Sequence, residues 1–427
     1  MNLRRFQLSR EMFRALATGA GGPEAIASLV DAEYCKHVIL LNGVLAAVRG
    51  TEDRAPVEEG CELLAEAWRA SPEATEAVVR YPAVGAWARR ALQAVRSGAS
   101  GTVAEPSGLL AVSAAAAIRA GLDARINVPV RDGLVVLPSL GAAVMPDSGK
   151  QAVTVHSRPG GATVGPVGVP PDPYVEAPGW LPLRRVRARA LDVLIDDLDP
   201  FRMPGLEGLS RREAASREWE HALQEAWLVL ESGHPGLAAE VGATVSVIVP
   251  QSPVSGRSIS STSPEAFGAV AMSVPTDPVS GAESLVHEVQ HLKLAALLDV
   301  VRLTLPDDSR RYYAPWRDDP RPLSGLLQGT YAFLGVTRFW REQRASGSAG
   351  GVDRKFARSL QGVTLAAGTL RASGRLTPAG QEFLEHIGQT LASWQHDSVP
   401  ATAWAEARRA ALAHQARWAA SNDPPRA

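Results

Sequence analysis

The stretch from Glu283 to Leu294 constrains the fold of this chain most, because its pattern requires a helix. It reads Glu-Ser-Leu-Val-His-Glu-Val-Gln-His-Leu-Lys-Leu and contains one His-Glu-x-x-His motif. On a helix, side chains four residues apart lie one turn apart on the same face, so His287 and His291 can hold one metal ion. Glu288 lies beside that face, within reach of a metal-bound water or a substrate proton. With nine His in 427 residues, a chance match is expected roughly once in a hundred such chains.

The residues around the motif predict where this helix begins. Ser280–Glu283 has the form of a capping box, Pro278 lies just upstream, and an apolar run follows through Leu298. The alternative is an apolar helix that carries two surface histidines by accident. That alternative is disfavoured, because such a helix rarely carries His-Glu-His without partners.

Composition and charge indicate a globular protein of two or three domains. The hydrophobic content is 45% and the charged content 21%, and the net charge of −1 argues against nucleic acid or an anionic membrane as a partner. No signal peptide is visible at the start, and the early apolar run 38–48 is too short to span a bilayer. Cys35 and Cys61 are the only cysteines, so we expect a cytoplasmic protein without a disulfide framework.

The residue patterns divide the chain into three consecutive regions. Residues 1–125 are predicted to be mostly helical, because they combine helical apolar spacing with abundant Ala. Residues 126–200 are predicted to be a β-rich segment and linker, either a small antiparallel meander or strands added to a later sheet. Within them, the Pro- and Gly-dense tract 159–182 is predicted to be a connecting loop. The helices predicted in the first region are Arg10–Thr18, Pro23–Arg49, Glu58–Ala70, Pro72–Arg80 and Val84–Arg96.

Residues 201–427 are predicted to form the catalytic domain. A strand at 243–249, a polar loop, a strand at 269–274 and a turn precede the metal helix, which is the order found in zincin-like α+β metal domains. The helices predicted after it are Leu323–Arg344, Val352–Ser373, Thr377–Trp394 and Ala401–Ser421. The expected fold class is therefore α+β and predominantly helical, with an N-terminal helical region, a small β-meander and a zincin-like metal domain.

Two histidines need a further metal ligand, and its identity distinguishes the possible functions. Three and six residues after His291 stand Leu294 and Leu297, which excludes the metzincin pattern. In the next predicted helix the first carboxylate, Glu342, is near the far end, whereas Gln328 is near the start. Gln328 can be the third ligand or a hydrogen-bonding neighbour of a ligand. A buried Gln bonded to backbone groups is the alternative that stays open.

The loop 307–322, before that helix, is rich in Arg and aromatic residues. Arg317 and Arg321 lie among Tyr313 and Trp316 in it. A planar guanidinium beside a metal suits a small dicarboxylate or a substrate carboxylate. The alternative is that these arginines pair with the Asp residues of the same loop.

Together these residues resemble the actinobacterial HEXXH-motif peptide-modification family. The resemblance rests on the motif at 287–291, on Tyr-Ala-Pro-Trp-Arg-x-x-Pro-Arg-Pro at 313–322, and on Gly-Leu-Leu-Gln-Gly-x-Tyr-Ala at 325–332. It spans most of residues 190–420. It implies an α-ketoglutarate/HExxH-type peptide β-hydroxylase that acts on a ribosomally synthesised precursor peptide, in RiPP biosynthesis.

The resemblance also implies a set of cofactors and ligands. Fe(II) would be held by His287, His291 and a third ligand, for which Gln328 is the candidate, and α-ketoglutarate and O₂ would be co-substrates. Glu288 would be a base or an orienting residue beside the metal, or a ligand of the iron itself.

The distal carboxylate of α-ketoglutarate would be held by Arg321 or Arg317, together with Tyr313. The main rival reading is a zinc metallopeptidase, with Zn(II) in place of iron and Glu288 as the general base on a metal-bound water. The missing downstream Glu and the Arg-aromatic loop disfavour it. A peptide-binding scaffold with a vestigial site is disfavoured further, since all motif residues are intact. The oligomeric state is not indicated by the sequence.

Overall fold

The computed structural model describes residues 8–98, 104–146, 149, 151–205, 217–346 and 351–422. Within these residues the protein is α+β and predominantly helical, as predicted. The chain divides into two compact units, each discontinuous in sequence. Among the described residues, unit 1 comprises Asp31–Gln224 and Val245–Val274, and unit 2 comprises Gln7–Val30, Glu225–Thr244 and Pro275–Ala427.

These units combine the three predicted regions in a different way. The β-rich segment 126–200 lies in unit 1 together with most of the N-terminal helices. Residues 245–274 also belong to unit 1, because their strands pair with a strand that ends at Ile195. The division into units therefore follows from hydrogen bonds between strands that are distant in sequence. Local residue patterns do not reveal such pairing.

The N-terminal part of the chain is helical, and all five helices predicted there are confirmed. They are α1 (Arg10–Ala17), α2 (Gly22–Ala47), α3 (Arg54–Ala70), α4 (Pro72–Val79) and α5 (Pro82–Ser97), followed by η1 (Pro106–Gly108) and α6 (Leu109–Ala120). The start of α4 shows why such bounds can be predicted. Ser71 accepts a hydrogen bond from the Ala74 backbone N–H at 3.4 Å, and Pro72 occupies the first helical position.

Two small antiparallel sheets of unit 1 contain the first seven strands. One has the order β1-β4-β5-β6 and the other β2-β3-β7. Their strands are β1 (Ala124–Pro129), β2 (Leu134–Leu137), β3 (Gly141–Val144), β4 (Ala152–Arg158), β5 (Gly161–Val164), β6 (Val167–Val169) and β7 (Trp180–Pro182). The prediction of a connecting loop at 159–182 is wrong, because β5, β6 and β7 lie in it. Gly160 and Gly165, with φ of 82° and 53°, form the tight turns that join β4 to β5 and β5 to β6.

The third sheet of unit 1 is mixed, with the order β11-β12-β10-β9-β8. Its strands are β8 (Arg184–Ala188), β9 (Leu191–Ile195), β10 (Val247–Pro250), β11 (Ser260–Ser261) and β12 (Ala269–Met272). β10 runs parallel to both β9 and β12, and every residue of β10 and β12 is buried. Continuous apolar strands are typical of such central parallel positions. Both alternatives left open for 126–200 therefore occur, since part of it is antiparallel sheet and β8 and β9 join a later sheet.

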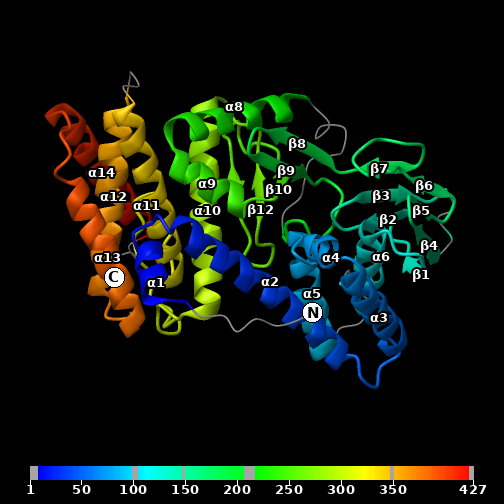
Figure 1. Cartoon of the computed structure of the whole chain (residues 1–427). Helices are drawn as coiled ribbons and strands as arrows, with labels where there is room; N and C mark the ends of the chain where they lie inside the picture. Colours follow the sequence, from blue (N-terminus) through cyan, green and yellow to red (C-terminus); the bar gives the residue numbers. More distant parts are fainter. Residues whose placement is uncertain are drawn as a thin grey trace. The chain divides into compact units, whose positions relative to one another are not determined.

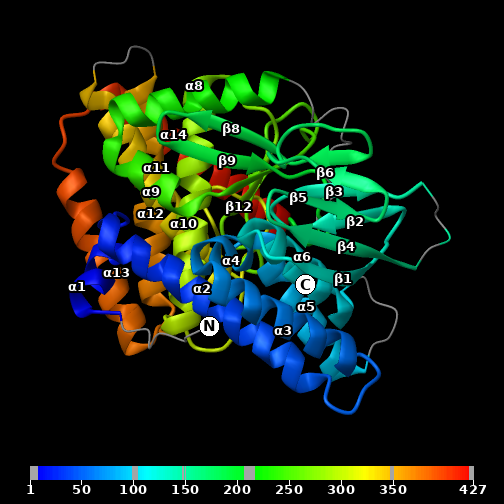
Figure 2. The ribbon, with the colours of Figure 1, turned by 45° about the vertical axis from the view of Figure 1, so that its right-hand side comes forward.

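Unit 2 is helical. It contains α1, α9 (Pro235–Thr244), α10 (Pro278–Val300), α11 (Leu323–Ala345), α12 (Val352–Ala372), α13 (Pro378–Trp394) and α14 (Ala401–Asn422), and α8 (Arg217–Gly233) ends in it. The four helices predicted after the motif are confirmed as α11 to α14. Figures 1 and 2 show α12 alongside α11, α13 and α14, and all three contact it. In the part of the chain that the structure describes, no helix is both long enough and apolar enough to cross a membrane.

Helix α10, which carries the His-Glu-x-x-His motif, begins earlier than its capping-box pattern predicts. Asp277 is the N-cap and accepts a hydrogen bond from the Ser280 backbone N–H at 2.9 Å, and Pro278 is the first helical residue. The predicted capping box at Ser280–Glu283 is therefore wrong. An Asp-Pro pair outcompetes it, because Asp caps well and Pro favours the first turn. Glu283 is left free for another contact, described below.

Candidate metal centre

The two histidines of the motif direct the same ring nitrogen toward one point. Both lie on α10, and His287 Nε2 is 3.2 Å from His291 Nε2. If each nitrogen lay about 2.05 Å from a metal ion, this separation would give an N–metal–N angle of about 100°. That angle lies between octahedral and tetrahedral geometry. The distance also suits an N–H···N hydrogen bond. It therefore locates a shared point without identifying what fills it.

The surroundings of His287 keep its imidazole neutral. Burial, with a smaller contribution from His291, lowers the pKa of His287 to about 3. Phe333 of α11 contacts the ring edge-on, with ring centroids 5.2 Å apart and planes at 84°. A neutral imidazole has a lone pair on its unprotonated nitrogen, which a metal requires. His287 is thus in the form that binds metal throughout the physiological pH range.

Gln328 lies behind His291, on the side away from His287. Its Oε1 is 3.1 Å from His291 Nδ1, so the Nδ1–H of His291 can donate to it. This bond selects the tautomer whose Nε2 lone pair faces His287. Metal-binding histidines usually donate their other ring N–H in this way, which fixes the ring and increases its basicity. The contact observed for Gln328 is therefore that of a hydrogen-bonding neighbour of His291.

A buried ion pair fixes α10 near the motif. Lys293 Nζ donates to Glu240 Oε2 at 2.6 Å, and to the backbone oxygens of Gly19 and Ala20 at 3.0 and 2.9 Å. Lys293 is 1% exposed and Glu240 4% exposed, and Arg338 donates to the other Glu240 oxygen at 3.1 Å. Because these contacts satisfy the ammonium group completely, α10 cannot rotate or slide without breaking them. The direction of both histidines follows from that constraint.

Glu288, the remaining residue of the motif, is buried, with 1% of its surface exposed. It directly follows His287 and so lies about 100° further around the helix. Among the described residues, no group of three or more His, Cys, Asp or Glu is arranged to hold a metal ion. The two imidazoles, with their Nε2 atoms 3.2 Å apart, are therefore the candidate ligands of this motif.

An aromatic wall lies next to His287. Phe333 stacks on Trp316, with ring centroids 4.6 Å apart and planes at 20°. Gly329, one turn before Phe333 on α11, makes room for the indole, since a Cβ there would be 2.5 Å from Trp316 Cζ2. The wall thus depends on a glycine in the helix and on an aromatic residue in the Arg-rich loop. It screens one side of the histidine pair.

The same wall borders a cavity of about 360 Å³. Glu283 of α10 lines it, together with Lys355 and Arg358 of α12. Trp340 Nε1 donates to Glu283 Oε1 at 2.9 Å, and burial raises the pKa of this carboxyl. The sequence reasoning missed these residues. One signal was present, because Glu283 precedes His287 by four residues and so lies one turn away on the same helix face.

Arg317 and Arg321 share one carboxylate of their own loop. Arg317 Nε donates to Asp319 Oδ1 at 2.7 Å, and Arg321 Nη1 donates to Asp319 Oδ2 at 3.1 Å. Neither arginine lines the cavity. Arg321 lies over the first turn of α11, where a Cβ at Gly325 would be 3.2 Å from its Nε. Both arginines therefore pair within their own loop in this structure, as the alternative prediction holds. Arg321 also lies next to Gly325, which precedes Gln328 by three residues on α11.

Tyr313 contacts α14. Its hydroxyl is 2.7 Å from His414 Nδ1, and His414 Nε2 is 3.3 Å from Asp318 Oδ1. Trp418 lies edge-on to the Tyr313 ring at 5.3 Å between centroids. His414 lines the cavity, whereas Tyr313 does not. Tyr313 is thus connected to the cavity through His414.

Comparison with known proteins adds no identification. No protein-family model matches the chain, and a search of curated proteins found no significant match.

Proposed function

We propose that this chain is an Fe(II)/α-ketoglutarate-dependent peptide β-hydroxylase, a non-haem iron dioxygenase acting on a ribosomally synthesised precursor peptide. The observation that carries the metal part is the 3.2 Å separation of His287 Nε2 and His291 Nε2. The resemblance of residues 287–332 to the HEXXH-motif peptide-modification family supports the reaction and the substrate class.

The residues around the histidine pair fit such a metal. His287 and His291 would hold it, and Gln328 would keep His291 Nδ1–H in place so that Nε2 stays aimed at the same point. Bound there with α-ketoglutarate and O₂, iron would supply the oxidising power needed to convert an unactivated C–H bond into C–OH. Three protein ligands would still leave open positions for both co-substrates. Glu288, buried beside the pair, would orient the peptide or hold a proton.

The co-substrate carboxylate requires a cation. Arg321 is our candidate, since it lies against the first turn of α11, and Arg317 and Tyr313 stand in the same loop. The side chain of Arg321 is 34% exposed, and that of its partner Asp319 is 49% exposed. A pair this exposed contributes little stability, so a dicarboxylate can displace Asp319 at small cost.

The proposal includes a zincin-like organisation of residues 201–427. Its support is the order of elements along the chain, in which β10, β11 and β12 are followed by the metal helix α10. This support is an analogy at the level of the fold, in which zincin-like domains carry their metal ligands on the helix after the sheet.

A zinc metallopeptidase is the second candidate, and the burial of an intact Glu288 directly after His287 favours it. In that reading Glu288 would take a proton from a zinc-bound water. A zinc peptidase with this motif would take its third ligand from a Glu on a later helix. The first carboxylate of α11, Glu342, is bonded to His234 and Arg338 instead. We therefore rank the peptidase second.

The two candidates differ in what they produce. The chain is reconstituted anaerobically with Fe(II), α-ketoglutarate is added, O₂ is admitted, and succinate is measured with and without candidate precursor peptides. We expect succinate in proportion to hydroxylated peptide, detected as a gain of one oxygen atom. Absence of succinate, together with Zn(II)-supported peptide cleavage, would replace the hydroxylase by the peptidase.

Two histidine variants provide the control. His287→Ala removes one of the paired imidazoles and should abolish either activity. His396→Ala removes an exposed imidazole after α13 and should leave activity unchanged. Equal activity of the two variants would reject the histidine pair as the metal site.

A further inference from the structure

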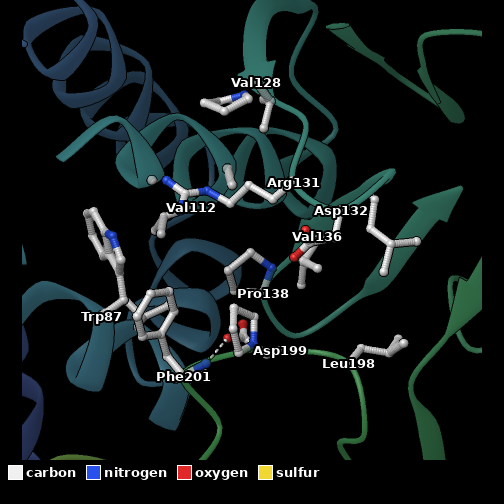
Figure 3. A pocket seen from close by; sticks show the side chains of 17 residues that line it. Trp87, Val112, Val128, Arg131, Asp132, Val136, Pro138, Leu198, Asp199 and Phe201 are labelled. Atoms are coloured by element: carbon white, nitrogen blue, oxygen red, sulfur yellow. Dashed lines mark hydrogen bonds between the residues drawn. The ribbon is translucent and has the colours of Figure 1, made fainter. Parts of the chain in front are cut away.

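Unit 1 contains a second cavity, independent of the histidine pair. It has a volume of about 170 Å³ and is lined by α5, α6, the segment from the end of β1 through β2, and the turn that follows β9. Figure 3 shows that Trp87 and Phe201 lie together on one side of it and that Asp199 lies next to Phe201. The remaining walls are mostly aliphatic, with Val112 and Val136 among them. An apolar group therefore fits this cavity.

Two buried carboxylates lie in the turn after β9, and one of them is fully bonded. Asp196 Oδ1 accepts from the backbone N–H groups of Leu198 and Asp199, both at 2.9 Å. Asp196 Oδ2 accepts from the Tyr81 hydroxyl at 2.6 Å. This set of bonds shapes the turn. Asp196 thus has a structural role and no capacity for a ligand.

Asp199 differs, because one of its oxygens is bonded and the other is not. Oδ1 accepts from the Phe201 backbone N–H at 2.8 Å, and Oδ2 forms no hydrogen bond with any described residue. Asp199 is only 5% exposed, yet it lines the cavity. Because Asp199 lines the cavity and this oxygen has no protein partner, Oδ2 is available to accept a hydrogen bond from a molecule bound there.

The charges around the cavity favour a cation. Arg131 is paired with Glu105 at 2.8 Å, so its charge is already compensated. Asp132 lies exposed at the rim and adds a carboxylate. Arg202 donates to the backbone oxygen of Asp199 at 2.6 Å and stands behind the turn. Asp199 and Asp132 are thus the carboxylates that line the cavity, and the lining arginine, Arg131, is already paired.

We propose that this cavity binds a small apolar amine as its ammonium ion, with the Asp199 carboxylate as counter-ion. The ammonium group would donate to Asp199 Oδ2, and the apolar part would lie against Trp87 and Phe201. A buried charge needs an opposite charge at hydrogen-bond distance, and Asp199 provides one. The indole face of Trp87 adds attraction for a cation. The site does not depend on the hydroxylase proposal.

Tryptamine is a suitable probe, because an indole fills the aromatic side and a two-carbon chain carries the ammonium. Tryptophol has the same ring and chain with a neutral hydroxyl, and indole-3-propionate has a negative charge instead. Calorimetric titration of the full chain should show one tryptamine site, at least tenfold weaker binding of tryptophol, and no binding of the acid. Equal binding of tryptamine and tryptophol, or no tryptamine site, would overturn the proposal.

Asp199→Asn tests the counter-ion. The amide keeps the shape and can still accept from Phe201, so tryptamine affinity should fall at least tenfold while tryptophol affinity stays the same. Asp132→Asn, at the exposed rim, is the matched control and should lower tryptamine affinity less than threefold. Unchanged tryptamine affinity in Asp199→Asn would contradict the proposal.

Proton release gives a test on the unmodified chain, in case Asp199→Asn fails to fold. Burial, followed by repulsion from Asp196, raises the pKa of Asp199 to about 7. An ammonium ligand favours the ionised carboxylate, so tryptamine binding at pH 6 should release close to one proton, and affinity should rise roughly tenfold per pH unit up to about 7.

Asp196, Tyr81 and Arg202 are the other ionisable groups near Asp199, and Arg131 and Asp132 lie at the same cavity. Burial raises the pKa of Asp196 as well, so its own proton is the main competing source. Asp196 has no free oxygen for the ligand, and the released proton is therefore assigned to Asp199. Binding without proton release at pH 6 would contradict this assignment.

Discussion

Gln328 Oε1 lies 3.1 Å from His291 Nδ1, on the opposite side of the imidazole from His287. The contact makes Gln328 a positioning residue for the proposed metal centre. Gln328→Ala should weaken Fe(II) or Zn(II) affinity roughly 10- to 100-fold, which is typical for loss of such a partner. Competition with a chelator measures it.

Gln328→Glu provides the control for that prediction, since a carboxylate also accepts from Nδ1–H. It should retain most of the metal affinity. If Gln328→Ala binds metal as tightly as the unaltered chain, Gln328 has no part in the centre.

Replacement of Lys293 should strongly lower the free energy of unfolding. Lys293→Met removes the partner of a buried Glu240 and should lower the free energy of unfolding by about 3 kcal/mol, since one member of a buried pair is left uncompensated. Arg338, which also bonds Glu240, will limit the loss. Urea unfolding measures it. Arg354→Met, in a side chain of α12 that is 63% exposed, is the control, and an equal loss in both variants would contradict the role of the buried pair.

The clamp for α-ketoglutarate is assigned to Arg321. Arg321→Ala should weaken α-ketoglutarate binding to the iron-loaded chain at least tenfold, because it removes the guanidinium that faces the first turn of α11. Arg317→Ala, in a side chain 52% exposed, should weaken it less. Anaerobic titration measures both.

Arg358 is the residue that could replace Arg321 in this role. It lines the cavity beside the aromatic wall and forms no ion pair with another described residue. If Arg358→Ala weakens α-ketoglutarate binding and Arg321→Ala does not, the clamp lies on α12 and the assignment to the loop is wrong.

The pKa of Asp199 predicts a specific pH dependence of stability. Burial raises this pKa from the ordinary 3.8 to about 7, so the folded chain holds a proton that the unfolded chain has lost. The stability from this group is therefore fully present below about pH 4 and is lost as pH rises through 7. The loss is a few kcal/mol at most, since one pKa unit corresponds to about 1.4 kcal/mol.

Asp199→Asn isolates that contribution, because an amide does not ionise. Thermal unfolding of both chains between pH 5 and 8 should show that the stability of the variant, relative to that of the unaltered chain, increases as pH rises. A constant difference across this range would mean that Asp199 does not titrate there.

Much of this fold could be predicted because its helices have local signals. Bounds of α11 to α14 follow from apolar spacing and from residues such as Thr377, which caps α13. The histidine pair was predictable for the same reason, because side chains four residues apart on a helix lie on the same face. Strands β5 to β7 were missed because they are only three or four residues long and alternate with Gly and Pro.

The partners within the candidate site were harder to predict. Asp319 accepts hydrogen bonds from both Arg317 and Arg321, and nothing in the sequence separates it from Asp307, Asp308 and Asp318 as a partner. The bond from Trp340 to Glu283 joins residues 57 positions apart, which helical periodicity alone does not reveal. Such contacts depend on how α10, α11 and α12 pack against one another, and that packing is a tertiary property.

The dependence of α-ketoglutarate binding on bound iron tests the central claim most directly. Anaerobic calorimetry would titrate α-ketoglutarate into the chain with and without one equivalent of Fe(II). We predict one α-ketoglutarate per chain when iron is present, little binding without it, and loss of both iron and α-ketoglutarate binding in His287→Ala but not in His396→Ala. Failure of the chain to bind iron, or α-ketoglutarate binding that is the same with and without iron, would contradict the account.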